Sequence, residues 1–219
     1  MSIDWASAAG IATAAGTALL AVATFLSTRT ANHAARSAER ARLESLQPVL
    51  TPSPWEAPIQ KVNFIDGHLM HVSGGRAAIE VTDKVVYMII SVRNVGRGLA
   101  VLHGWALPPD RMSERTPLSG FHLLQRDIFI APDYDGFVQI ASREPGSEEF
   151  AALVSGARSD VFWVDLLYSD IESTQRLVTR FAASRAPDGT DAKGELIASV
   201  VRYWTLDGPD PHESRRQLE

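Results

Sequence analysis

The chain has 219 residues, of which 45% are hydrophobic and 21% charged, and its net charge is −5. This mild acidity argues against nucleic acid as a partner, because phosphate binding needs a basic surface. The absence of Cys excludes a thiolate nucleophile, a zinc ribbon and a redox pair, and it agrees with a reducing compartment.

The first expected element is one long helix from Asp4 to Leu46, which Pro48 ends. Its first part, Trp5 to Leu26, has 22 residues without a charge. At a rise of about 1.5 Å per residue this part is about 33 Å long, enough for a hydrocarbon core of about 30 Å. We therefore expect a transmembrane helix over 1–28, a helical stalk over 29–47, a β domain over 48–207 and a disordered tail over 208–219.

Two alternatives stay open for the uncharged segment. The first is a cleaved signal peptide, because Ala21-Val22-Ala23 looks like a cleavage site. Against it, the residues before the apolar run include Asp4 and no Lys or Arg, the reverse of the basic start of a signal peptide. The second is a helix buried in the core of a protein or an oligomer.

The charges on either side of the uncharged segment predict its orientation. No Lys or Arg precedes it, whereas Arg29, Arg36, Arg40 and Arg42 follow within 16 residues of Leu26. The positive-inside rule then places the N-terminus outside and the C-terminal domain in the cytoplasm. The lipid bilayer is the first expected partner, with the arginines next to its anionic headgroups.

The long helix has two different faces when its residues are placed at 100° intervals. One face carries large apolar side chains, and the other carries small and hydroxylated ones, namely Ala6, Gly10, Thr13, Thr17, Thr24 and Ser27. Stripes of this kind allow close helix packing in lipid, so we expect the helix to self-associate or to pack on another membrane protein. Chance is the alternative, since nine of the 22 uncharged residues are Ala.

The residues after Pro48 are expected to form short strands separated by turns. The strongest strand signal is 85–95, rich in β-branched residues, and Asn94 to Gly98 predicts a hairpin or a tight corner into the run 99–107. A helix is expected over 148–156 and a hairpin over 161–182, with further strands at 49–50, 126–130, 137–141 and 197–206. This pattern predicts a mainly β fold, an antiparallel β-sandwich of the immunoglobulin-like kind, with a small barrel as the alternative.

The order of these features resembles a broad group of uncharacterised single-pass proteins from high-GC bacteria. The likeness rests on the uncharged segment, the Arg/Ala-rich stalk, a Gln-Pro-Val segment at 47–49 and the pattern Asn-x-Gly-x-Gly-x-Ala at 94–100. An aromatic-rich hairpin around Tyr168 and Phe181 completes it. The resemblance implies a membrane helix, a stalk and a β-sandwich domain, and it assigns no activity.

Short motifs for cofactors and metals have structural explanations. The Gly96-x-Gly98 pair lacks the following helix of a dinucleotide fingerprint and is expected to be a turn. His68 and His71 lie three residues apart in a region expected to be loop and strand, where ordinary surface histidines are favoured over metal ligands. The segment 133–136 lacks the third ligand and the Glu of a calcium loop, so a turn is favoured there too. We therefore expect no cofactor and no metal.

Asp165, Asp170 and Glu172 form the acidic group with a general acid–base interpretation. Asp165 lies inside an apolar run, so we favour a structural pair with Arg180 or Arg93 across the sheet. The two acids at the hairpin tip are expected to be solvated.

Four of the tryptophans, Trp55, Trp105, Trp163 and Trp204, fall in or beside expected strands, where core packing is the simplest role. Trp55 and Trp204 are the candidates for exposed anchors in a protein interface. Together these features predict a membrane-anchored, non-enzymatic protein-interaction module, an accessory or scaffold protein without catalytic residues. The alternatives are an exported or outward-facing ligand-binding β domain and, less favoured, a small hydrolase using Asp165 and Asp170.

Overall fold

The computed structural model describes residues 5–185 and 195–207, with side chains described for residues 17, 20–39, 41–42 and all described residues from Leu46 onward. The chain divides between Ser45 and Leu46 into two compact units. The expected tail over 208–219 lies outside the described residues.

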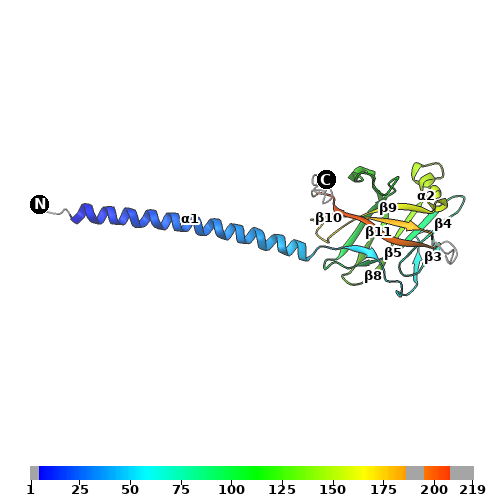
Figure 1. Ribbon diagram of the computed structural model, residues 1–219, viewed down its shortest axis with the longest axis horizontal. Coiled ribbons are helices and arrows are strands. Elements are labelled where there is room, and N and C mark those ends of the chain that lie inside the picture. The colour runs from blue at the N-terminus through cyan, green and yellow to red at the C-terminus, as the bar shows by residue number, and fades with distance from the viewer. Residues whose placement is uncertain (1–4, 186–194, 208–219) are drawn as a thin grey trace. The chain divides into compact units, whose positions relative to one another are not determined.

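The first unit is the helix α1 (Trp5–Ser45), 41 residues long and unbroken (Figure 1). Its sequence contains no Pro and is rich in Ala, the best helix former. The expected N-terminal helix is therefore confirmed. Within the part of the chain that the structure describes, no helix is long and apolar enough to cross a membrane.

The second unit is mainly β, as expected. Its strands in chain order are β1 (Leu50–Pro52), β2 (Gln60–Asn63), β3 (Leu69–Val72), β4 (Arg76–Val81), β5 (Val86–Asn94), β6 (Ala100–Ala106), β7 (His122–Ile130), β8 (Asp135–Ser142), β9 (Val161–Ser169), β10 (Arg176–Ser184) and β11 (Glu195–Thr205). A 3-10 turn, η1 (Leu118–Gly120), precedes β7, and the helix α2 (Glu148–Arg158) precedes β9. The expected β9–β10 hairpin is confirmed, with Asp165 directly opposite Arg180.

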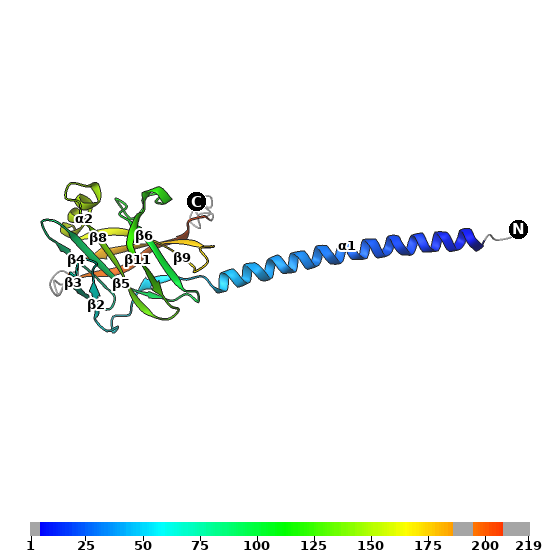
Figure 2. The same ribbon diagram turned by 180° about the vertical axis from the view of Figure 1, so that it is seen from behind.

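The main sheet is one curled antiparallel sheet of nine strands, seen from behind in Figure 2. Its order is β1-β5-β4-β11-β10-β9-β6-β7, and β8 pairs with β5. Among the described residues, no backbone hydrogen bonds pair β7 with β8. A side-chain hydrogen bond links these two strands, because the Arg126 Nη2 donates to the Gln139 Oε1 at 3.0 Å. The expected sandwich is not confirmed, because these strands form a single sheet and not two facing ones.

The strand β5 is buried on both of its faces. Met88 and Ile90 point into the main core, with Leu166 and Phe181 of the β9–β10 hairpin. Tyr87 and Ile89 point the other way and are covered by the two-stranded sheet β2–β3 through a second cluster that includes Val62, Phe64, Met70 and Val72. Coverage on both faces explains why every residue of β5 except Arg93 is buried, a pattern usual for a central strand.

The segment between β5 and β6 is a tight corner and not a hairpin. β5 pairs with β1, β4 and β8, whereas β6 pairs with β7 and β9. The chain therefore leaves one part of the curled sheet at Asn94 and enters another at Ala100.

Candidate functional site

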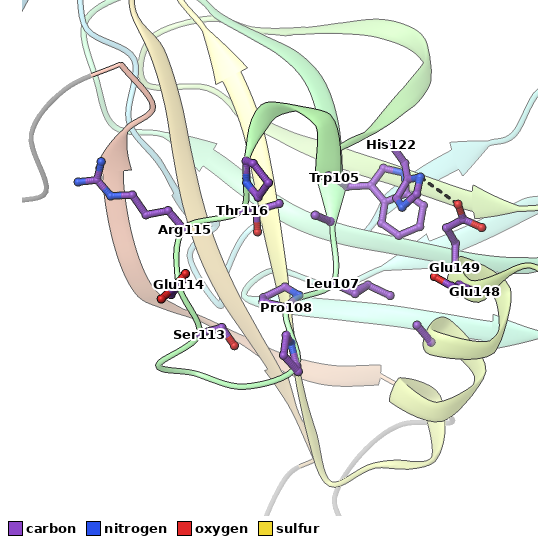
Figure 3. Close-up of a pocket in the computed structure, with 15 residues that line it drawn as sticks. Trp105, Leu107, Pro108, Ser113, Glu114, Arg115, Thr116, His122, Glu148 and Glu149 are labelled. Atoms are coloured by element: carbon purple, nitrogen blue, oxygen red, sulfur yellow. Dashed lines mark ion pairs between the residues drawn. The ribbon is translucent and has the colours of Figure 1, made fainter.

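A cleft of about 550 Å³ lies beside the N-terminal part of the α2 helix. Its walls come from the end of β6, the loop 107–121, the start of β7 and the first turn of α2. Figure 3 shows the loop residues Ser113 to Thr116 on the left and Glu148 and Glu149 on the right. We call this hollow the β6–α2 cleft.

Two aromatic rings, tilted by 44° against each other, form one wall of the β6–α2 cleft. Trp105 on β6 lies opposite His122 on β7, and their ring centroids are 4.9 Å apart. A Cβ at Gly104 would lie 2.7 Å from the His122 carbonyl oxygen, so the close approach of these two strands requires a glycine there. Pro108 and Pro117 extend the apolar lining.

The adjoining wall is the N-terminus of α2, where the carboxylates of Glu148 and Glu149 lie. Ser147 caps this helix by accepting from the Phe150 amide at 3.2 Å. The pKa of Glu149 is lowered by its hydrogen bonds with the Ser147 side chain and its own backbone amide, and His122 adds to this effect. The His122 Nδ1 lies 3.3 Å from the Glu149 Oε1, so the ring pair and the N-terminus of α2 are joined directly (Figure 3).

A buried ion pair holds the loop that forms the rim. The Arg180 Nε donates to the Asp165 Oδ1 at 2.7 Å and its Nη2 to the Oδ2 at 2.9 Å, and both side chains are 0% exposed. The same guanidinium donates to the carbonyl oxygens of Asp110, Arg111, Ser113 and Glu114 at 2.9–3.4 Å. The Thr116 hydroxyl donates to the Asp165 Oδ2 at 2.7 Å. The expected structural pair of Asp165 with Arg180 is confirmed, while Arg93 lies 3.6 Å from Asp135 instead.

The three acids with a catalytic interpretation do not form one site. Both carboxylate oxygens of Asp165 accept hydrogen bonds in a fully buried position. Asp170 is only 7% exposed and accepts from the Thr174 hydroxyl and the Gln175 amide, so the expectation that it is solvated is wrong. Glu172 is exposed, as expected.

The two candidate interface tryptophans have opposite outcomes. Trp55 is 56% exposed, with the Arg76 guanidinium 4.9 Å from its ring. Trp204 is 0% exposed, so its candidacy as an exposed anchor is wrong. Its ring centroid lies 5.5 Å from the guanidinium carbons of both Arg180 and Arg202, so it helps to enclose the buried ion pair.

The small-residue stripe of α1 is described in part. The side chains of Ala6, Gly10 and Thr13 lie outside the described ones, whereas Thr17, Thr24 and Ser27 are exposed. The Thr24 hydroxyl donates to the Leu20 carbonyl of its own helix at 2.8 Å. Self-association along this stripe stays a prediction.

The histidine pair and the acidic turn have structural roles. His68 stacks on Tyr87 with ring centroids 4.1 Å apart, and its Nε2 lies 3.1 Å from the Glu80 carboxylate. His71 is exposed on β3. In the described residues no three His, Asp or Glu side chains are grouped as a metal site would need. Asp133 has a φ of 61° and its amide donates to the Asn94 carbonyl, which confirms the expected turn.

The two motif segments that carry the resemblance meet in space. The Asn94 Oδ1 accepts from the amides of Val49 and Gly96 at 3.1 and 3.0 Å. The Arg97 amide donates to the Gln47 carbonyl at 3.2 Å. A Cβ at Gly96 or Gly98 would overlap the backbone of residues 46–49, so both glycines are needed for close approach. We call this arrangement the Asn94 clamp.

The sequence did not predict the β6–α2 cleft, although it contains patterns that indicate two of the segments that line the cleft. The Pro108-Pro109 pair and Pro117 bracket the loop, and Ser147 with two following acids begins a helix. These signals predict a loop and a helix start, but not that they face each other.

Comparison of the chain with protein-family models, with curated proteins and with solved structures gives no match. The proposals below therefore rest on the residues and the geometry of this chain.

Proposed function

We propose that the chain is a membrane-anchored, non-enzymatic interaction module whose cytoplasmic β domain holds a segment of a partner protein in the β6–α2 cleft. Support for the anchor comes from the uncharged run 5–26 and from large apolar side chains on α1 that are 55–70% exposed, namely Leu20, Val22, Phe25 and Leu26. So many large exposed apolar side chains within seven residues need a lipid or protein environment. The arginines after them support the cytoplasmic orientation.

The observation that carries the binding role is the fixed rim of the cleft. Arg180 and Asp165 together make five hydrogen bonds with the rim loop, four from the Arg180 guanidinium to carbonyl oxygens and one from the Thr116 hydroxyl to Asp165. A preformed cleft saves a partner segment the entropic cost of ordering this loop.

The lining of the cleft indicates a protein segment as its occupant. Rings and prolines on one wall suit apolar side chains of an extended segment, as in proline-rich recognition. The carboxylates of Glu148 and Glu149 on the other wall favour a neighbouring basic group on that segment.

Two neighbouring alanines on α2 provide a matched test. Ala152 lines the cleft and Ala151 does not, and both are exposed. We expect Ala152→Arg to abolish co-purification of partner proteins from solubilised membranes, whereas Ala151→Arg retains it. Equal capture by both variants would show that the cleft is not the binding site.

The anchor has its own test. Because no helix in the described part of the chain qualifies as a span, insertion is the first point to establish. The full-length protein should stay with membranes after alkaline extraction, and a C-terminal reporter should be active only in the cytoplasm. Release of the protein from membranes at high pH would refute membrane anchorage. A reporter active outside the cell would favour the alternative, an exported ligand-binding domain.

A further inference from the structure

One face of α1 carries a short row of basic side chains directly after its apolar part. Arg29, His33 and Arg36 follow at steps of four and three residues, and Phe25 precedes them by one turn. At 3.6 residues per turn these four side chains lie within an arc of about 80°. All four are exposed, and we call Arg29, His33 and Arg36 the basic row.

The arginines of the basic row are available to an external anion. Arg29 and Arg36 have no ion-pair partner among the described residues, whereas Arg42 lies 3.4 Å from the Glu39 carboxylate. Arg42 is also placed on the other side of the helix, 13 positions after Arg29, about 140° away at 3.6 residues per turn. The helix thus presents two free guanidinium groups on one side and a paired one on the other.

We propose that the basic row recognises anionic lipid headgroups, with Arg29 bound to their phosphate groups and Arg36 adding electrostatic attraction from outside the headgroup layer. The proposal rests on the membrane anchorage put forward above. Guanidinium groups bind phosphate with paired, charge-assisted hydrogen bonds. The exposed Phe25 and Leu26, one turn earlier, favour lipid over free phosphate, because they supply the apolar contact that an acyl chain needs.

Their distances along the helix predict that Arg29 contributes more than Arg36 to lipid binding. At about 1.5 Å per residue, Arg29 lies about 4.5 Å beyond Leu26 and Arg36 about 15 Å beyond it. The headgroup layer is about 5–7 Å thick on each side of the bilayer. Arg29 therefore reaches phosphate directly, while Arg36 lies about one Debye length outside the layer and acts through the surface potential.

The test uses the full-length protein in vesicles of phosphatidylcholine with a fraction of phosphatidylglycerol. Electron spin resonance with spin-labelled lipids measures the preference of the protein-bound lipid shell for phosphatidylglycerol. We expect a preference of about fivefold, the effect of one basic residue at an anionic surface. Arg29→Gln should bring it close to one, Arg36→Gln should lower it less, and Arg42→Gln should leave it unchanged.

Three results would overturn the basic row as a lipid site. They are equal preference for both lipids in the inserted protein, an Arg42→Gln effect as large as that of Arg29→Gln, and loss of the preference in inorganic phosphate at matched ionic strength. Flotation separates this inference from the anchor. A protein that floats only with phosphatidylglycerol vesicles would retain the basic row and refute the anchor, and one that floats with neither would refute both.

Discussion

The buried pair of Asp165 and Arg180 gives the sharpest quantitative prediction. Both side chains are 0% exposed, so Asp165→Asn leaves the Arg180 charge in the interior without an anion. Breaking a buried ion pair in this way costs about 3–5 kcal/mol. A typical domain has about 5–15 kcal/mol of stability, so this single change removes a large part of it.

The double variant Asp165→Leu with Arg180→Met separates charge burial from loop anchoring. Replacing both charges by apolar side chains of similar size is often neutral or stabilising, so most of the lost stability should return. The loop 110–116, however, loses the groups that its carbonyls and the Thr116 hydroxyl contact. We therefore expect a stable fold with a mobile cleft rim.

Urea unfolding of the full-length protein in detergent measures these changes. Tryptophan fluorescence is a suitable signal, because the Trp204 ring lies 5.5 Å from the Arg180 guanidinium. Hydrogen exchange should be faster in the loop 110–116 of the double variant and unchanged in β9 and β10. A cost below about 1 kcal/mol for Asp165→Asn, or a double variant no more stable than the single ones, would refute the reasoning.

Three further changes test other parts of the fold. Gly98→Ala should destabilise the β domain by about 1–3 kcal/mol, since the added methyl group overlaps the Leu46 carbonyl oxygen, and a thermal melt unchanged from wild type would contradict the close approach. Ser147→Ala should cost about 1 kcal/mol in urea unfolding by removing the cap of α2, and no loss would mean that the cap is dispensable. Burial raises the pKa of Asp66, but hydrogen bonds from Arg143, Tyr87 and the backbone outweigh it and lower that pKa to about 2. Because the folded pKa is depressed, the stabilisation is present above pH 4 and is lost as the pH falls towards 2. For a partly exposed pair it amounts to about 1 kcal/mol or less. Asp66→Asn should flatten this part of the acid unfolding curve, and an unchanged curve would exclude Asp66 as its source.

Local patterns were enough to place most long strands. The β-branched run that becomes β5 and the two apolar runs that become β9 and β10 were predicted, and Arg180 was one of the two partners expected for Asp165. The strands β2 to β4 were missed, because β2 has one buried residue, Val62, among four. A short strand with so little apolar content gives no periodic signal, and its partner β3 is equally short.

Pairing between distant strands was beyond the sequence. The same set of strands can form two facing sheets or one curled sheet, and the choice depends on contacts such as Arg126 with Gln139 across β7 and β8. Trp204 illustrates the same limit for a single residue. It alternates with neighbours on β11 that are more exposed, and the strand register decides which face of the sheet the buried Arg180 occupies.

Polar residues inside two apolar strands, Asn94 in β5 and Arg180 in β10, each hold an irregular segment of the chain against the sheet. Asn94 ends the apolar run of β5 and satisfies backbone groups of the Asn94 clamp, donating to the carbonyls of Gly98 and Ile130 at 2.7 and 3.0 Å. Arg180 interrupts the apolar run of β10 and satisfies the carbonyls of the cleft rim. Irregular backbone that packs on a sheet needs partners for its polar groups, and a strand side chain at 0% exposure supplies them. A buried Asn or Arg within an apolar run therefore indicates that a loop is held against that strand, which is how the sequence marks the places where this domain fixes its N-terminal connection and its cleft.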